Sequence, residues 1–203
     1  RLKAAYYRML DNFTSRWDDR VVCVSDSVRR DVIAQGIPES KAVTIRNGID
    51  LSRVDFASQP LEELRRQLGL PGGIPLLGTA ARLSGQKDIG TLLRAMPDVW
   101  RCQPKARLLL MGSGPLEPDL RALAASLDRE GRISFLGHRE DAERIIAALD
   151  VFCLPTWYEG LPISVLEAMA CSRPVLCSPE AGTLEAVVPG ETALIAQAGD
   201  VGA

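Results

Sequence analysis

Two glutamates eight residues apart, Glu159 and Glu167, are the residues whose types and spacing point most clearly to chemistry. They lie where an apolar stretch, 151–154, gives way through Gly160 and Pro162 to a segment typical of a helix. The first amides of a helix lack intrahelical partners and the macrodipole is positive there, so this junction attracts phosphate. Carboxylates repel phosphate but accept hydrogen bonds from sugar hydroxyls. The arrangement predicts a ligand with phosphate in the middle and a sugar at each end, such as a nucleotide-sugar.

A second pair of candidate residues, Arg82 and Lys87, stands five residues apart in a glycine-containing loop. A guanidinium fork and an ammonium point charge can approach one diphosphate from two sides. Fixed positive groups also stabilise the charge that grows on a departing diphosphate. The sequence has no Asp-x-Asp motif and no His/Cys ligand cluster, so we expect this chemistry to proceed without a metal. We expect backbone groups at the helix start to assist, namely those of Gly160, Leu161, Pro162 and Ile163.

A weaker signal is the pair of glycines Gly112 and Gly114, which follow the apolar stretch 106–111. Glycines there would let the backbone come close to a ligand. The pattern is not a dinucleotide fingerprint, because Glu117 stands where a third glycine would be needed. A tight turn without a ligand explains the two glycines nearly as well.

The run Glu159 to Ala170 resembles the E-x7-E signature of retaining, nucleotide-sugar-dependent glycosyltransferases with the two-domain GT-B fold. The resemblance is to the "glycosyl transferases group 1" family (family 4) in particular. It implies that Glu159 lies near the donor sugar and that Glu167 holds the ribose hydroxyls.

The same resemblance assigns the positive residues. The family pattern G-R-L-x-x-x-K-G uses its arginine and lysine on the pyrophosphate, and here these are Arg82 and Lys87. The sequence departs from the pattern at Ala81 and Asp88, where glycine is usual. The resemblance also implies that the loop around His138 forms the base pocket, mainly through backbone groups. Although His138 is the only histidine, we therefore do not expect it to be catalytic.

Composition is that of an ordinary globular protein: 203 residues with a net charge of −2. This charge gives no overall basic field for nucleic acid or an anionic membrane surface. Five scattered cysteines without a C-x-x-C pair favour a reduced compartment. No apolar stretch approaches the ~20 residues that span a bilayer. We expect a cytoplasmic protein that binds no nucleic acid, and leave open peripheral association of the full-length protein with the inner face of the membrane.

The elements that must position these residues alternate from residue 75 onward. Continuous apolar runs separated by helical patterns predict an α/β fold, a Rossmann-like parallel sheet with helices on both faces, as in the C-terminal half of a GT-B glycosyltransferase. Ligands of such sheets bind beyond the carboxyl ends of the strands. The predicted strands are 75–81, 106–111, 133–136, 151–154, 174–177 and 193–195, and the predicted helices are 88–100, 117–129, 141–149, 163–171 and 183–187.

The residues before this sheet predict the end of another domain. A helix over 1–18 with one apolar face precedes a strand at 20–24, a helix at 28–35 and a short strand at 42–45. By the resemblance, 1–47 would be the end of an N-terminal acceptor domain with its linker, and 48–203 a truncated nucleotide-sugar-binding domain. We expect a short surface helix at 61–68. Because the chain opens with Arg1 and stops after a strand, we expect it to be a piece of a longer protein.

These observations predict a retaining glycosyltransferase of hexosyl type. It would move sugar from a UDP- or GDP-sugar, a substrate rather than a cofactor, to a glycan, lipid-linked or small-molecule acceptor bound through the N-terminal domain. The fragment alone is expected to be inactive. Two alternatives stay open: a non-catalytic nucleotide-sugar-binding module, and a sugar-nucleotide epimerase or phosphorylase on the same fold, for which we find no cofactor lysine motif or extra histidines.

Overall fold

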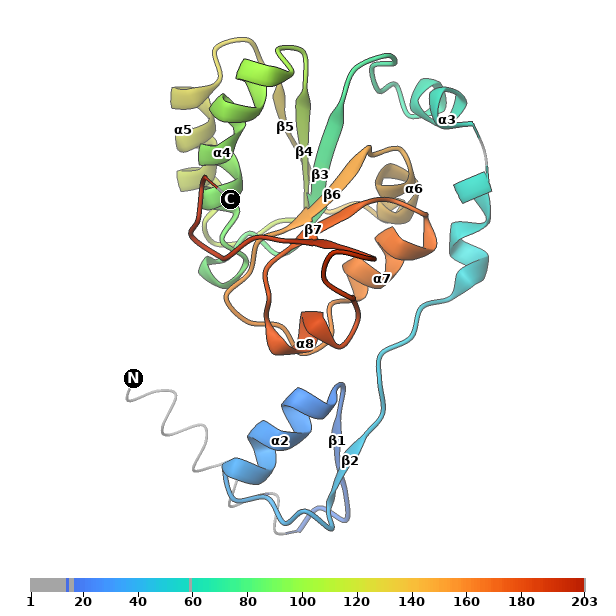
Figure 1. The fold of residues 1–203 in the computed structure, drawn as a ribbon, viewed down its shortest axis with the longest axis vertical. Helices are drawn as coiled ribbons and strands as arrows, with labels where there is room; N and C mark the ends of the chain where they lie inside the picture. The colour runs from blue at the N-terminus through green and yellow to red at the C-terminus, as the bar shows by residue number, and fades with distance from the viewer. Residues whose placement is uncertain (1–13, 15–16, 59, 203) are drawn as a thin grey trace. The chain divides into compact units, whose positions relative to one another are not determined.

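The computed structural model describes residue 14, residues 17–58 and residues 60–202. The chain divides into two compact units, Arg1–Gly48 and Ile49–Ala203 (Figure 1). The helix predicted over residues 1–18 falls outside the described residues except at its last positions.

The first unit is a strand, a helix and a second strand. The strands β1 (Val21–Cys23) and β2 (Ala42–Thr44) pair in parallel, and α2 (Asp26–Ala34) connects them. Ser25 caps the helix, because its side chain accepts a hydrogen bond from the backbone N–H of Val28 at 3.2 Å. The predicted order of elements is confirmed for this part of the chain.

The second unit is built on a six-stranded parallel sheet with the order β5-β4-β3-β6-β7-β8. The chain runs outward from β3 to one edge, returns to the other side of β3, and continues to the opposite edge. The strand order therefore reverses between β3 and β6, where open α/β sheets bind ligands. The predicted α/β fold is confirmed. The strands are β3 (Leu76–Ala80), β4 (Arg107–Met111), β5 (Ile133–Gly137), β6 (Val151–Leu154), β7 (Val175–Cys177) and β8 (Leu194–Ile195).

Helices cover both faces of this sheet (Figure 1). In β4, Leu108 and Leu110 pack into the core beneath α4 and α5, whereas Leu109 and Met111 pack into the core beneath α6 and α7. Burial on both sides explains why the strands are continuous apolar runs. The remaining elements are the 3-10 helices η1 (Leu51–Ser58) and η2 (Gly85–Lys87) and the helices α3 (Leu61–Gln67), α4 (Ile89–Cys102), α5 (Glu117–Leu127), α6 (Ala142–Ala147), α7 (Ile163–Ala170) and α8 (Ala181–Leu184).

The helix α3 confirms the predicted short surface helix at 61–68, with Glu62, Arg66 and Gln67 exposed. Arg65 on its inner face is only 3% exposed. Its guanidinium donates to the carbonyl oxygens of Ala148 at 3.0 Å and Ile74 at 3.2 Å, and to the Asp150 carboxylate at 2.7 Å. Asp150 also accepts from the Leu76 backbone N–H at 2.7 Å. Arg65 thus joins α3 to the amino ends of β3 and β6, the end of the sheet opposite the expected ligand.

We expect Arg65→Ala to lower the free energy of unfolding by about 3 kcal/mol, since it leaves buried carbonyls unsatisfied and a carboxylate without its cation. Arg66→Ala is the matched control, because Arg66 on the same helix is 74% exposed and pairs with Glu63 at the surface. Chemical denaturation of the three proteins measures the difference. Equal unfolding midpoints for the two variants would contradict a structural role for Arg65.

All five cysteines are free thiols, and Cys153, Cys171 and Cys177 are buried in the sheet core. Burial raises the pKa of Cys153 to about 12 and those of Cys171 and Cys177 to about 11, so these thiols stay protonated and act as small apolar side chains. None of the helices in the described ranges combines the length and apolar character needed to cross a bilayer.

Candidate functional site

The centre of the site is an ion pair between Lys87 and Glu159. Lys87 ends the turn η2 that follows β3, and Glu159 lies in the loop that follows β6. These two strands are neighbours, so the two loops meet at the point where the strand order reverses. The Lys87 ammonium donates to a Glu159 carboxylate oxygen, and the side chains are 18% and 8% exposed. The structure therefore brings together two of the predicted residues, 72 positions apart in sequence.

Backbone and side-chain hydrogen bonds tie the same two loops together. The Gln86 amide donates to the carbonyl of Tyr158 at 2.7 Å, and the Gln86 carbonyl accepts from the Trp157 N–H at 2.9 Å. The Thr156 hydroxyl also donates to the Gln86 carbonyl, at 3.1 Å. Sequence reasoning did not identify Gln86 and Thr156, because isolated polar residues in loops carry no local pattern. Their bonds fix the loop geometry that brings Lys87 to Glu159.

The helix α8 packs against the turn that carries Glu159. A Cβ atom on Gly182 would lie 2.0 Å from the carbonyl oxygen of Gly160 and 2.3 Å from that of Glu159. No side chain fits there, so only glycine allows this approach. The stretch 181–185, which contains Gly182, therefore supports the Glu159 turn.

The start of α7 supplies the positive helix end expected from the sequence. Ile163 and Ser164 occupy its first turn, where backbone N–H groups have no intrahelical partner. Pro162 is the N-cap, and having no N–H it cannot donate a hydrogen bond. The prediction of a backbone donor at Pro162 was therefore wrong. Gly160, Leu161 and Ile163 retain N–H groups at this junction.

Arg82 lies two residues beyond the end of β3 and is exposed. Its guanidinium makes no hydrogen bond or ion pair with any residue that the structure describes. The structure therefore does not join Arg82 to the Lys87–Glu159 pair, although both basic residues belong to the loop after β3. An unpaired guanidinium at the carboxyl end of this strand can bind an anion without first losing a protein partner.

Glu167 lies on the second turn of α7 in a partly buried position. Burial raises the pKa of its carboxyl, the charge of Glu143 raises it further, and Arg53 opposes the shift. Arg53 and Glu143 form an ion pair of 2.6 Å, in which the Glu143 side chain is 9% exposed. This pair could not be predicted from sequence, because Arg53 comes from η1 and Glu143 from α6.

We expect Glu167→Gln to stabilise the protein at neutral pH. When folding raises the pKa of a carboxyl, the free energy of unfolding falls as pH rises through that raised pKa. Glutamine does not titrate, so the variant avoids this loss of stability. The stabilisation should shrink as pH falls towards about 4, where the unfolded glutamate is also protonated. Thermal unfolding against pH measures the effect, with the exposed Glu191→Gln as control. A Glu167→Gln protein that is less stable than the wild type at neutral pH would contradict this prediction.

Gly112 and Gly114 bring two loops together. A Cβ atom on Gly112 would lie 2.1 Å from the carbonyl oxygen of Ala81, and one on Gly114 would lie 2.3 Å from that of Leu83. The Leu83 N–H donates to the Ser113 carbonyl at 3.0 Å. The close approach seen here is between the loops after β4 and β3, and approach to a ligand stays a prediction.

His138 is exposed at the carboxyl end of β5. This strand is separated from β3 by β4, so His138 stands apart from the Lys87–Glu159 pair. In the chain as described, no three His, Cys, Asp or Glu side chains gather in a way that could hold a metal ion.

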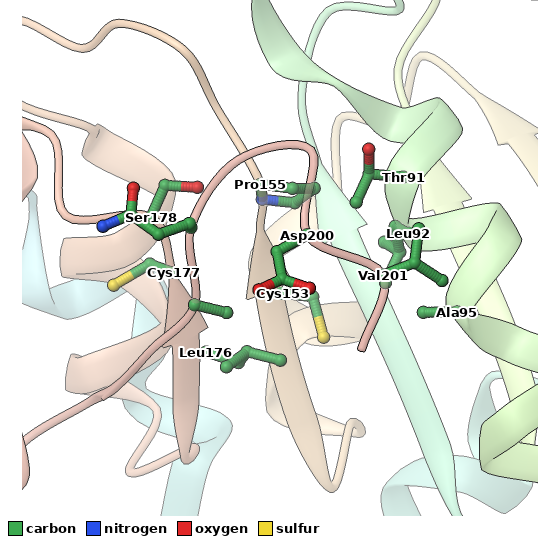
Figure 2. Close-up of a pocket in the computed structure, with 12 residues that line it drawn as sticks. Thr91, Leu92, Ala95, Cys153, Pro155, Leu176, Cys177, Ser178, Asp200 and Val201 are labelled. Carbon is green, nitrogen blue, oxygen red and sulfur yellow. The ribbon is translucent and has the colours of Figure 1, made fainter. Parts of the chain in front are cut away.

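Two cavities flank the loop that carries Lys87. One of about 70 Å³ lies between α4, the ends of β6 and β7 and the C-terminal segment (Figure 2), and another of about 350 Å³ lies between the starts of α4 and α5. Neither is lined by Lys87, Glu159 or Glu167. The smaller cavity is far below the ~300 Å³ at which small-molecule sites begin.

Comparison with known proteins identifies the family of the chain. Residues 74–203 match the family model described as "Glycosyl transferases group 1", and residues 1–53 match "Glycosyltransferase Family 4". The GDP-mannose-dependent monoacylated alpha-(1-6)-phosphatidylinositol monomannoside mannosyltransferase of Corynebacterium glutamicum is 34% identical over 76% of this chain and 42% of its own length. The alpha-monoglucosyldiacylglycerol synthase of Streptococcus pneumoniae is 30% identical over 78% of this chain and 37% of its own length.

A solved structure extends the comparison to the fold. Anabaena HepE in complex with UDP-glucose superimposes with a TM-score of 0.85 at 26% identity, covering 96% of this chain and 54% of HepE. The chain thus spans about half the length of the proteins it matches. It belongs to the glycosyl transferases group 1 family, and its sheet with helices on both faces is that of a GT-B glycosyltransferase.

Proposed function

We propose that this chain carries the donor-binding part of a retaining glycosyltransferase that transfers a hexosyl group from a nucleotide-diphosphate-sugar. The observation that carries the proposal is the Lys87–Glu159 ion pair where the strand order reverses between β3 and β6. It sets a cation and a carboxylate side by side next to the helix end at Ile163 and in the same loop system as Arg82. HepE binds UDP-glucose and the corynebacterial relative is named for GDP-mannose, which supports a UDP- or GDP-sugar donor.

In the proposed reaction the bond between the anomeric carbon and the phosphate oxygen breaks, and the nucleoside diphosphate leaves with growing negative charge. Lys87, Arg82 and the first amides of α7 stabilise that charge more in the transition state than in the ground state. Lys87 has three N–H donors, so it can bind phosphate while keeping one hydrogen bond to Glu159. The Glu159 carboxylate orients the donor sugar and favours an oxocarbenium-like transition state. The acceptor hydroxyl attacks from the same face and gives its proton to the departing phosphate oxygen, so the anomeric configuration is retained.

We assign binding of the nucleoside to residues outside the Lys87–Glu159 pair. Glu167 accepts hydrogen bonds from the ribose hydroxyls, and the backbone around His138 forms the base pocket. Gly112 and Gly114 place the loop after β4 beside the loop of Arg82, and so shape the site next to the nucleotide. No resident cofactor or metal is proposed, because the donor is itself a substrate and the cations Lys87 and Arg82 take the metal's electrostatic role.

The acceptor is proposed to be a glycan, a lipid-linked sugar or a small molecule held by an N-terminal domain, of which residues 1–47 form the end. One relative is named for a lipid acceptor, a phosphatidylinositol monomannoside, and another for a lipid product, alpha-monoglucosyldiacylglycerol. They support a lipid-linked acceptor and peripheral contact of the full-length protein with the inner face of the membrane.

Calorimetry with UDP, GDP and ADP tests donor binding by residues 1–203, and a transfer assay on the same chain tests activity. We expect measurable nucleoside diphosphate binding and no sugar transfer. Robust transfer by this chain would contradict the proposal that it holds only half of the active site. In the full-length protein, Arg82→Ala should weaken nucleotide binding and reduce the cellular glycan that the enzyme makes; unaffected cellular glycan would favour a non-catalytic module.

A further inference from the structure

Asp88, immediately after Lys87, has a backbone conformation that side chains rarely adopt. It joins η2 to α4 with φ 43° and ψ 38°, in the left-handed region. Among residues other than glycine, Asp and Asn tolerate this region best. Glycine would meet the backbone requirement at lower cost, so the carboxylate at this position needs a separate reason.

The carboxylate of Asp88 links the Lys87 loop to the C-terminal segment. One oxygen accepts hydrogen bonds from the Thr91 hydroxyl at 2.8 Å and from the Gly199 N–H at 2.8 Å. Gly199 has φ +81°, and a Cβ atom there would lie 3.0 Å from the Trp157 ring. Gly199 therefore contacts both catalytic loops, that of Lys87 through Asp88 and that of Glu159 through Trp157.

The C-terminal segment 196–201 borders a cavity. It passes over the cavity of about 70 Å³, with Thr91, Leu92 and Cys153 on one side and Asp200 and Val201 on the other (Figure 2). Over this cavity the segment does not pack directly against α4 and β6. Its hydrogen bonds therefore matter for its position, namely that of the Gly199 N–H to Asp88 and that of the Ala196 N–H to the Cys177 carbonyl at 3.0 Å.

We propose that Asp88 is a positioning residue for Lys87, which it holds next to Glu159 by latching the loop to Gly199 and Thr91. The inference rests on the proposed function, in which Lys87 stabilises the departing diphosphate. With the latch closed, the backbone on the carboxyl side of Lys87 is fixed before the donor arrives. Without the hydrogen bonds of Asp88, the loop and the Lys87 side chain become ordered only when the donor binds. The free-energy cost of immobilising the side chain then lowers the affinity for the donor.

Two substitutions separate the latch from the backbone conformation. Asp88→Gly keeps the left-handed conformation but removes the acceptor, whereas Asp88→Asn tolerates the same conformation and keeps an acceptor oxygen. We expect Asp88→Gly to weaken UDP or GDP binding by roughly three- to tenfold and Asp88→Asn to stay within about twofold of the wild type. If Asp88 serves only as a turn residue, Asp88→Gly will bind nucleotide as well as the wild type, and the proposal is wrong.

A double-mutant cycle tests whether the effect passes through Lys87. In a Lys87→Ala background, Asp88→Gly should cause no further loss of nucleotide affinity, because the positioned group is gone. An equal loss in both backgrounds would contradict the proposal. Loss of binding in Lys87→Ala alone tests the proposed function, so the two ideas can fail separately.

A measurement without nucleotide uses the small number of lysines. The chain contains Lys3, Lys41, Lys87 and Lys105, so ¹³C-dimethylation gives few NMR signals, and Lys87→Arg identifies that of Lys87. In Asp88→Gly we expect the Lys87 signal to move towards those of exposed lysines, while Asp88→Asn leaves it in place. An unmoved Lys87 signal in Asp88→Gly would overturn the proposal even if no nucleotide bound.

Discussion

Glu159→Gln in the full-length protein should lower kcat by about 10²–10³-fold and leave nucleoside diphosphate affinity unchanged or slightly higher. The amide has nearly the same size and keeps an oxygen that can accept from Lys87. The substitution removes the negative charge that favours the oxocarbenium-like transition state. Deleting one electrostatic group of this kind lowers kcat by about the factor given above. It also leaves the Lys87 ammonium without a counter-charge, which favours phosphate binding.

Steady-state kinetics and calorimetry measure the two quantities separately. Glu191→Gln is the matched control, since it makes the same chemical change at an exposed position. Unchanged kcat in Glu159→Gln would show that the ion pair with Lys87 only stabilises the fold. Weaker nucleotide binding with kcat unchanged would show that Glu159 stabilises the ground state and the transition state equally.

Most of the sheet could be predicted from sequence because its strands are buried on both faces. The run Leu108 to Met111 is apolar at every position, since alternate residues enter different cores. Each of the six predicted strands overlaps one that is observed, and every strand end agrees within one residue. Short 3-10 segments such as η1 at Leu51–Ser58 were not predicted, because their apolar residues do not recur at a regular spacing.

The site could be predicted by residue type but not by contact. Glu159 and Lys87 stand in recognisable patterns, whereas their ion pair depends on β3 and β6 being neighbours, which only the fold determines. Residues that act through distant partners leave no local signal. Arg65 bonds to a carbonyl 83 positions away and Asp88 to an amide 111 positions away. Such residues look like ordinary surface charges in sequence, and their burial or bonding becomes visible only in three dimensions.

Gly182→Ala should lower kcat/KM by about 10²-fold, although Gly182 bears no functional side chain. The added methyl would lie 2.0 Å from the Gly160 carbonyl oxygen and 2.3 Å from that of Glu159, so α8 and the Glu159 turn must move apart. A shift of about 1 Å in a catalytic group costs roughly this much, because the reaction depends on close alignment. Gly85→Ala is the control: it adds the same methyl to the neighbouring Lys87 loop, where no atom lies within 4 Å.

A double-mutant cycle that combines Gly182→Ala with Glu159→Gln identifies how the added methyl group lowers kcat/KM. If Gly182→Ala acts by displacing the Glu159 carboxylate, the double variant will be little slower than Glu159→Gln alone, because the displaced charge is already absent. If instead the methyl disturbs the α7 start that binds phosphate, the two losses will multiply and nucleotide affinity will fall as well. Since the Cβ clash is with the carbonyl oxygens of Glu159 and Gly160, before α7 begins at Ile163, we expect the first result.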